Sequence, residues 1–126
     1  MANILVIEDD ELVASAIEAV LMKAGHTVTL AGNGELGLTK FAAAPADVVI
    51  TDIIMPRKDG RATISELRAR APHLPIIAIS GGGRAKKYDF LRTDDKSGAT
   101  EVLYKPFSNS ELIATVSKLL GLAGGT

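Results

Sequence analysis

The sequence predicts an α/β fold in which five parallel strands form one sheet with helices on both faces. Short apolar runs alternate with longer amphipathic segments along the whole chain, as in repeated strand–helix units. Three of these runs are apolar throughout, which is typical of strands buried on both faces. A length of 126 residues with 47% hydrophobic residues suits a single domain with a sizeable core. We therefore expect residues 1–126 to form one domain without a second, output domain.

The first half of the chain is expected to form strands over residues 3–7, 27–31 and 48–52. The runs over residues 3–7 and 48–52 are almost entirely apolar. The run over 27–31 alternates polar and apolar residues, which suggests a half-exposed strand. Asp10 is expected to cap the first helix, and Gly25 to end it. A second helix is predicted over residues 35–43. The inward-facing positions are predicted to be Val13, Ile17, Val20, Leu21 and Ala24 in the first helix, and Leu38 and Phe41 in the second.

The second half continues the same alternation. A helix over residues 61–70 would turn Ile64 and Leu67 inward, and a fully apolar strand over 76–79 ends at Ser80. A weaker, more polar helix is predicted over 84–96 and an amphipathic strand over 101–105. Ser108 and Glu111 have the spacing of a capping box that starts the last helix. The apolar stripe of that helix comprises Leu112, Val116, Leu119 and Leu120.

Burial predicts the order of the strands. The first, third and fourth are apolar and should be central, while the amphipathic second and fifth should lie at the edges. The flavodoxin-like order 2-1-3-4-5, a doubly wound (βα)5 sheet, satisfies this with right-handed crossovers. Ligands of such sheets bind at the carboxyl ends of the strands, where the order reverses between the first and third strands. Glu8, Asp9 and Asp52 lie at that point in the sequence.

The residues predicted at this edge suit phosphoryl transfer. Converging carboxylates repel one another, and a hard cation such as Mg²⁺ relieves that repulsion with oxygen ligands and retained waters. Ser80 and Lys105 end two further strands with a hydroxyl and an ammonium group. A carboxylate nucleophile, a cation site, a hydroxyl and a lysine around one cavity would allow a phosphoryl group to be transferred to Asp52.

The sequence resembles the receiver domains of response regulators in two-component signalling, of the chemotaxis-type, single-domain kind. The resemblance spans nearly the whole chain, and its motifs occur in the order found in that family. They are Ile4-Leu5-Val6-Ile7-Glu8-Asp9-Asp10, Asp52-Ile53-Ile54-Met55-Pro56 with Asp59-Gly60, Ile79-Ser80, and Lys105-Pro106-Phe107.

The resemblance implies a role for each residue of the site. Asp52 would accept a phosphoryl group from a histidine of a sensor kinase or a histidine phosphotransfer protein. Asp9 would bind Mg²⁺ directly, Glu8 would hold metal-bound water, and the backbone carbonyl of Ile54 would complete the protein's ligands. Lys105 would contact the phosphoryl group, and the Lys105–Pro106 peptide would be cis.

The resemblance also implies a conformational switch. Ser80 would move toward the phosphoryl group, and the surface formed by the fourth helix, fifth strand and fifth helix would then bind a downstream protein. The sequence departs from the family pattern in two places. Val102 occupies the usual aromatic position three residues before Lys105, while Tyr104 lies next to the lysine. The segment after Ser80 is longer than usual and begins Gly81-Gly82-Gly83.

Two other functions fit the sequence less well. Residues 32–37 match G-x-G-x-x-G, but the preceding strand is predicted at the sheet edge, and the loop at the switch point is acidic and would repel a pyrophosphate. Aspartyl-phosphate phosphatases need a second aspartate two residues after the nucleophile, where this chain has Ile54. We therefore expect no enzyme beyond catalysis of the chain's own phosphorylation and dephosphorylation. A phosphate sink and a silent interaction module remain as alternatives.

The composition of the chain indicates which partners and which cellular location to expect. A formal net charge of −1 argues against direct nucleic-acid binding. No apolar run approaches the ~18 residues of a membrane span, and the N-terminus shows no signal-peptide pattern. The chain contains no cysteine. We therefore expect a cytoplasmic protein that makes no membrane contact.

Overall fold

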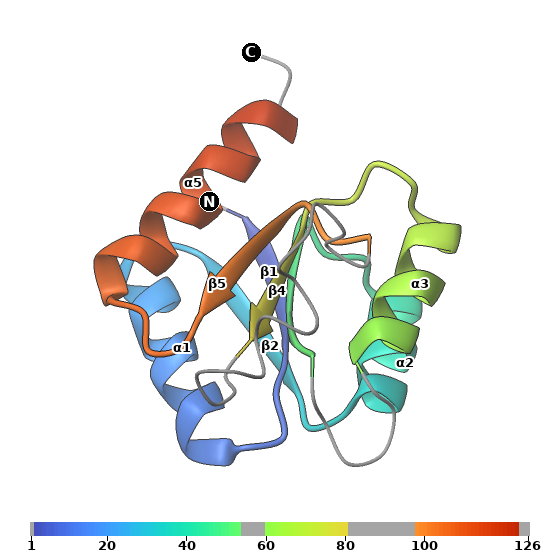
Figure 1. The fold of residues 1–126 in the computed structure, drawn as a ribbon, viewed down its shortest axis with the longest axis horizontal. Helices are drawn as coiled ribbons and strands as arrows, with labels where there is room; N and C mark the ends of the chain where they lie inside the picture. The colour runs from blue at the N-terminus through green and yellow to red at the C-terminus, as the bar shows by residue number, and fades with distance from the viewer. Residues whose placement is uncertain (1, 54–59, 81–97, 124–126) are drawn as a thin grey trace.

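The computed structural model describes residues 2–53, 60–80 and 98–123, which form a sheet layer between two helical layers (Figure 1). The strands are β1 (Asn3–Ile7), β2 (Thr27–Ala31), β3 (Val48–Asp52), β4 (Ile76–Ser80) and β5 (Glu101–Tyr104). The helices are α1 (Glu11–Lys23), α2 (Gly34–Ala43), α3 (Gly60–Arg70) and α5 (Asn109–Ala123). The helix predicted over 84–96 falls outside the described residues.

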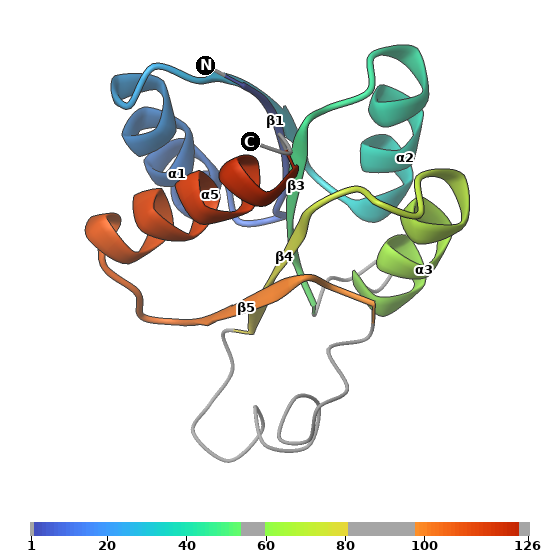
Figure 2. The same cartoon turned by 90° about the horizontal axis from the view of Figure 1, so that it is seen from above.

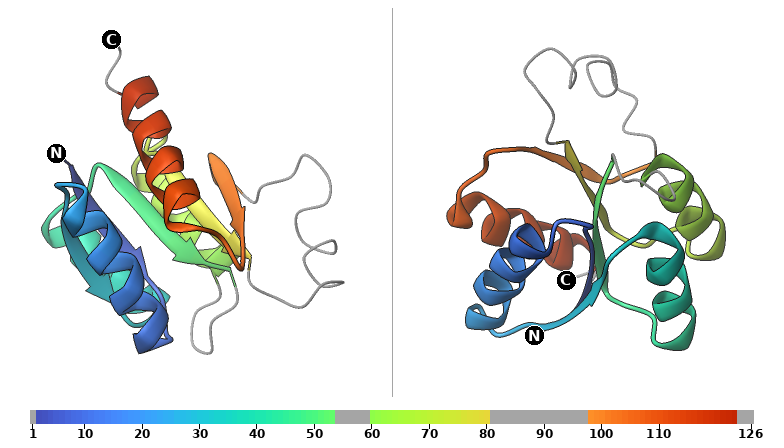
Figure 3. Two further views of the ribbon diagram at one scale, coloured as in Figure 1. Left: turned by 90° about the vertical axis from the view of Figure 1, so that its left-hand side faces the viewer. Right: turned by 90° about the horizontal axis from the view of Figure 1, so that it is seen from below.

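The sheet confirms the predicted topology. All neighbouring strands are parallel, and their order is β2-β1-β3-β4-β5. Helices α1 and α5 cover one face, and α2 and α3 cover the other (Figure 2). Because the strands are parallel, their carboxyl ends all reach the same edge of the sheet (Figure 3).

Alternating side chains of the central strands build two hydrophobic cores. Leu5, Val49 and Ile76 pack on the α2–α3 side, whereas Ile4, Ile50 and Ile77 pack on the α1–α5 side. Each of these six side chains is at most 2% exposed. This two-sided burial explains why β1, β3 and β4 contain so few polar residues. The same alternation places Glu8 and Asp52, which follow Val6 and Ile50 at spacing two, on the α1–α5 side.

The predicted helix ends are confirmed. The Asp10 carboxylate accepts hydrogen bonds from the backbone N–H groups of Leu12 and Val13. Gly25, with φ of 100°, follows the end of α1. The Ser108 hydroxyl accepts from Glu111 N–H, and the Glu111 carboxylate accepts from Ser108 N–H, which completes the capping box. Ala24 was wrongly placed in the buried stripe: it is the exposed C-cap of α1, where the helical periodicity has ended.

The glycine-rich turn after β2 has a structural role. The Asn33 side chain caps α2 by accepting from Leu36 N–H at 2.8 Å. Gly37 packs against Ile7, where a Cβ atom would lie 2.4 Å from Ile7 Cδ1. The preceding strand β2 lies at the edge of the sheet, as predicted. The G-x-G-x-x-G turn is therefore not at the point between β1 and β3 where a dinucleotide would bind. Among the described helices, none has the length and apolar character needed to cross a bilayer.

Candidate functional site

The predicted site residues that the structure describes lie where four strands reach the carboxyl edge of the sheet. The backbone hydrogen bonding of the sheet continues one residue past the strands and holds the site there. Glu8 N–H donates to Ala31 O at 2.9 Å, Ile53 N–H to Ile79 O at 3.0 Å, and Lys105 N–H to Ser80 O at 2.9 Å. The site is therefore anchored on the rigid sheet rather than on free loops.

Lys105 connects the two buried carboxylates of the site. Its Nζ lies 3.1 Å from Asp52 Oδ2 and 3.5 Å from Glu8 Oε1. Desolvation of the ammonium group works against its charge, but the carboxylates of Asp52 and Glu8 outweigh it and raise the pKa of Lys105. The lysine therefore carries a positive charge beside the Asp52 carboxylate at neutral pH.

Glu8 is the most strongly perturbed acid among the described residues. Only 3% of the residue is exposed, and Oε2 accepts a hydrogen bond from Asp10 N–H at 3.0 Å. Burial, together with the neighbouring Asp52 carboxylate, raises the pKa of Glu8 to about 7, although the Asp10 N–H and Lys105 oppose this effect. In the absence of a cation, Glu8 therefore holds its proton more tightly than an exposed glutamate does.

The acidic cluster has the chemistry of a divalent-cation site. Glu8, Asp9 and Asp52 each offer a carboxylate oxygen, and these oxygens lie within 4.8 Å of one another. A cavity of about 490 Å³ opens beside Glu8 and Asp9, so two of these carboxylates border open space. Asp10 is engaged in capping α1, so the Glu-Asp-Asp run supplies Glu8 and Asp9 to the cluster. The predicted ligand Ile54 lies outside the described residues.

Ser80 and β5 occupy the far side of the site. Ser80 ends β4 and is 6% exposed, next to the strand that carries Asp52. Val102, at the position where the family has an aromatic residue, packs against the core on the α2–α3 side, while Tyr104 is 38% exposed. The Lys105–Pro106 peptide is cis, as the resemblance implied. The run Gly81-Gly82-Gly83 falls outside the described residues.

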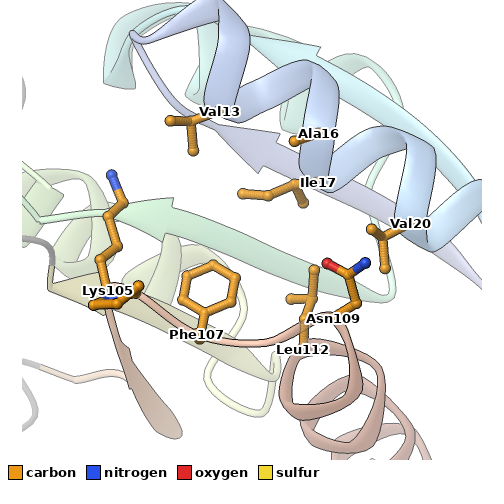
Figure 4. A pocket seen from close by; sticks show the side chains of 9 residues that line it. Val13, Ala16, Ile17, Val20, Lys105, Phe107, Asn109 and Leu112 are labelled. Carbon is orange, nitrogen blue, oxygen red and sulfur yellow. The ribbon is translucent and has the colours of Figure 1, made fainter.

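An apolar groove next to Lys105 was not predicted from the sequence. It has a volume of about 290 Å³ and lies between α1 and the start of α5 (Figure 4). Val13, Ala16, Ile17, Val20, Pro106, Phe107, Asn109 and Leu112 line it together with Lys105. Val13 and Val20, which were predicted to face inward, are half-buried: they pack against the core on the α1–α5 side and also line this groove. The sequence carried no signal for this groove, because its lining comes from α1 and from residues 105–112, which are far apart in the chain.

Comparison with known proteins agrees with the geometry. Residues 4–117 match the model of the response regulator receiver domain. The transcriptional regulatory protein DltR of Streptococcus agalactiae is 33% identical over 114 residues, which cover 90% of this chain and 50% of DltR. The chain thus spans about half the length of the curated relatives it matches.

Solved structures give the same result. A response regulator receiver domain protein from Clostridium thermocellum superposes with a TM-score of 0.84 at 30% identity, covering 96% of this chain and 95% of the other. The chemotaxis response regulator CheY4 of Vibrio cholerae has a TM-score of 0.82 at 27% identity, covering 94% and 98% of the two chains. The chain therefore belongs to the receiver domain family of two-component response regulators.

Proposed function

We propose that this receiver domain accepts a phosphoryl group on Asp52 from a phosphohistidine of a sensor kinase or a histidine phosphotransfer protein. The single observation that carries the proposal is the contact of 3.1 Å between Lys105 Nζ and Asp52 Oδ2 inside an acidic cluster. Folding alone does not require such a group of buried charges at the mouth of a sheet, because each charge costs desolvation energy.

In this proposal an Asp52 carboxylate oxygen attacks phosphorus with a lone pair. A P–O bond forms, the P–N bond to histidine breaks, and the histidine nitrogen keeps that electron pair. Lys105 is placed to donate hydrogen bonds to the oxygens of the transferring group. Glu8, Asp9 and Asp52 would hold Mg²⁺, which when bound neutralises negative charge on those oxygens. The chain would promote its own phosphorylation and dephosphorylation, and we expect no further enzymatic activity.

The groove beside Lys105 suggests where the donor is bound. A helix that carries the phosphohistidine could place apolar side chains against Val13, Ile17 and Phe107, and its histidine would then lie near Lys105 and Asp52. The exposed Leu12 would extend the same contact surface. The donor would therefore approach along α1 and the start of α5.

The response to phosphorylation would be carried by Ser80 and the surface around β5 and α5. Ser80 is the last residue of β4, and β5 with its exposed Tyr104 is the adjacent edge strand. A shift of Ser80 toward the phosphoryl group would change this edge and thereby the affinity for a downstream protein. With a net charge of −1, we expect the domain itself to contact protein rather than nucleic acid.

Intact mass spectrometry after incubation with acetyl phosphate tests the proposal. We expect a gain of one phosphoryl group with Mg²⁺, little gain in EDTA, and none in Asp52→Asn. Phosphorylation of Asp52→Asn to the wild-type extent would contradict the assignment. A folded wild-type chain that is phosphorylated neither by acetyl phosphate nor by a panel of phosphorylated histidine donors would indicate a silent interaction module.

A further inference from the structure

Gly60 lies in unusually close contact with the backbone of the residue that we propose is phosphorylated. A Cβ atom built on Gly60 would lie 2.1 Å from the carbonyl oxygen of Asp52 and 2.6 Å from Cα of Ile53. Gly60 N–H also donates to Ile53 O at 2.7 Å. The first residue of α3 therefore rests directly on the backbone of residues 52 and 53.

The requirement for glycine at this position is one of space. Among the described glycines, Gly25 and Gly98 have positive φ, and Gly60 is not one of them. Alanine could thus adopt the backbone conformation of Gly60, but its methyl group would collide with backbone atoms. Backbone atoms of a central strand cannot rotate away as the end of a side chain can, so either β3 or α3 would have to move.

We propose that Gly60 is a positioning residue for the Asp52 carboxylate. Without a side chain at residue 60, α3 can lie against Asp52 and Ile53 while the carboxylate stays 3.1 Å from Lys105 Nζ. A methyl group there would displace Asp52 relative to Lys105 and Glu8, both of which are held by other strands. This inference rests on the proposed phosphorylation of Asp52.

Two other glycines of the chain provide matched controls. Gly37 is also buried in a helix, but an added Cβ would meet only the side chain of Ile7, in the core beneath α2. Gly121 is exposed on α5, and nothing lies within 4 Å of its Cβ position. Gly37→Ala thus tests a steric effect on packing, and Gly121→Ala tests the change of residue type alone.

The experiment compares the wild type with Gly60→Ala, Gly37→Ala and Gly121→Ala. For each protein, Mg²⁺ affinity is measured by calorimetry, reactivity as the initial rate of phosphorylation by acetyl phosphate, and stability by unfolding in urea. We expect Gly60→Ala to lower the phosphorylation rate by about tenfold to a hundredfold and to weaken Mg²⁺ binding, because small displacements of reacting groups have effects of that size. Gly37→Ala should lose stability yet bind Mg²⁺ and react as the wild type does. If Gly60→Ala is folded and stays within about twofold of the wild type in both Mg²⁺ affinity and rate, the proposal is overturned.

Two further measurements test the proposal if the Gly60→Ala variant does not fold. The variant can be made in the Gly121→Ala background, which we expect to be more stable. In the wild type, Mg²⁺ saturation should shift the Gly60 amide resonance more than that of Gly121, and an unmoved Gly60 resonance would overturn the proposal. The wild-type result separates the two claims: absent phosphorylation there refutes the proposed function, whereas equal phosphorylation of the wild type and Gly60→Ala refutes only the role of Gly60.

Discussion

Replacing Glu8 with glutamine is expected to stabilise the metal-free protein at alkaline pH. A pKa of about 7 in the folded chain, against an ordinary value of 4.5, means that folding favours the protonated acid. The unfolded chain loses this proton first as the pH rises, so stability is lost between about pH 4.5 and 7. At about 1.4 kcal/mol per pH unit, this loss amounts to roughly 3 kcal/mol above pH 7.

Glutamine removes the buried charge but keeps a similar shape, and its carbonyl oxygen can still accept from Asp10 N–H. In EDTA, the two proteins should differ little at pH 4.5, and Glu8→Gln should be more stable by about 3 kcal/mol at pH 8. Urea unfolding at several pH values measures this difference. With Mg²⁺ the order should reverse, because the wild type binds the cation and the variant loses a carboxylate.

The wild type should also bind Mg²⁺ more weakly as the pH falls below about 7, because a proton then competes at Glu8. The Gln variant should lack this pH dependence. A Glu8→Gln chain that is less stable than the wild type at pH 8 in EDTA, with an unchanged pH profile, would refute the inferred cost of the buried charge.

Three other substitutions test separate parts of the structure. Asp9→Asn should weaken Mg²⁺ binding at least about tenfold in calorimetry, since a charged ligand is lost; unchanged affinity would remove Asp9 from the site. Arg68→Met should cost about 1.5–3 kcal/mol in urea unfolding, because the guanidinium donates to the carbonyls of Gly98, Pro72 and Leu74; an unaltered midpoint would show that these bonds are replaced by water. Gly121→Ala should add about 0.5–1 kcal/mol of stability, since it replaces an exposed helical glycine that has open space around its Cβ position; a loss of stability would contradict the open surroundings.

The strand order could be predicted because polarity differs so clearly between strands. Only central strands are buried on both faces of a sheet. The strand residues that are buried in this way are Ile4 to Ile7, Val48 to Ile50 and Ile76 to Ile79. The half-exposed strands β2 and β5 were correctly left for the edges. Helix boundaries were accurate to within about one residue where a cap such as Asp10 or Ser108 marked the start.

That Glu8, Asp9, Asp52 and Lys105 lie close together could also be predicted, because residues at the carboxyl ends of parallel strands meet at one edge of the sheet. What could not be predicted is how these residues influence one another. The raised pKa of Glu8 depends on its burial and its distance from Asp52, which no sequence pattern encodes. The groove along α1 likewise arises from the packing of segments that are far apart in the sequence, and the close contact of Gly60 depends on how α3 packs against the end of β3.

The most direct test of the central claim is to locate the phosphoryl group chemically. The chain would be phosphorylated by acetyl phosphate with Mg²⁺, reduced with borohydride, digested and mapped by mass spectrometry. Borohydride converts an aspartyl phosphate to homoserine, so we predict homoserine at residue 52 and unmodified Asp9 and Glu8. Homoserine at another aspartate, with residue 52 unchanged, would contradict the account.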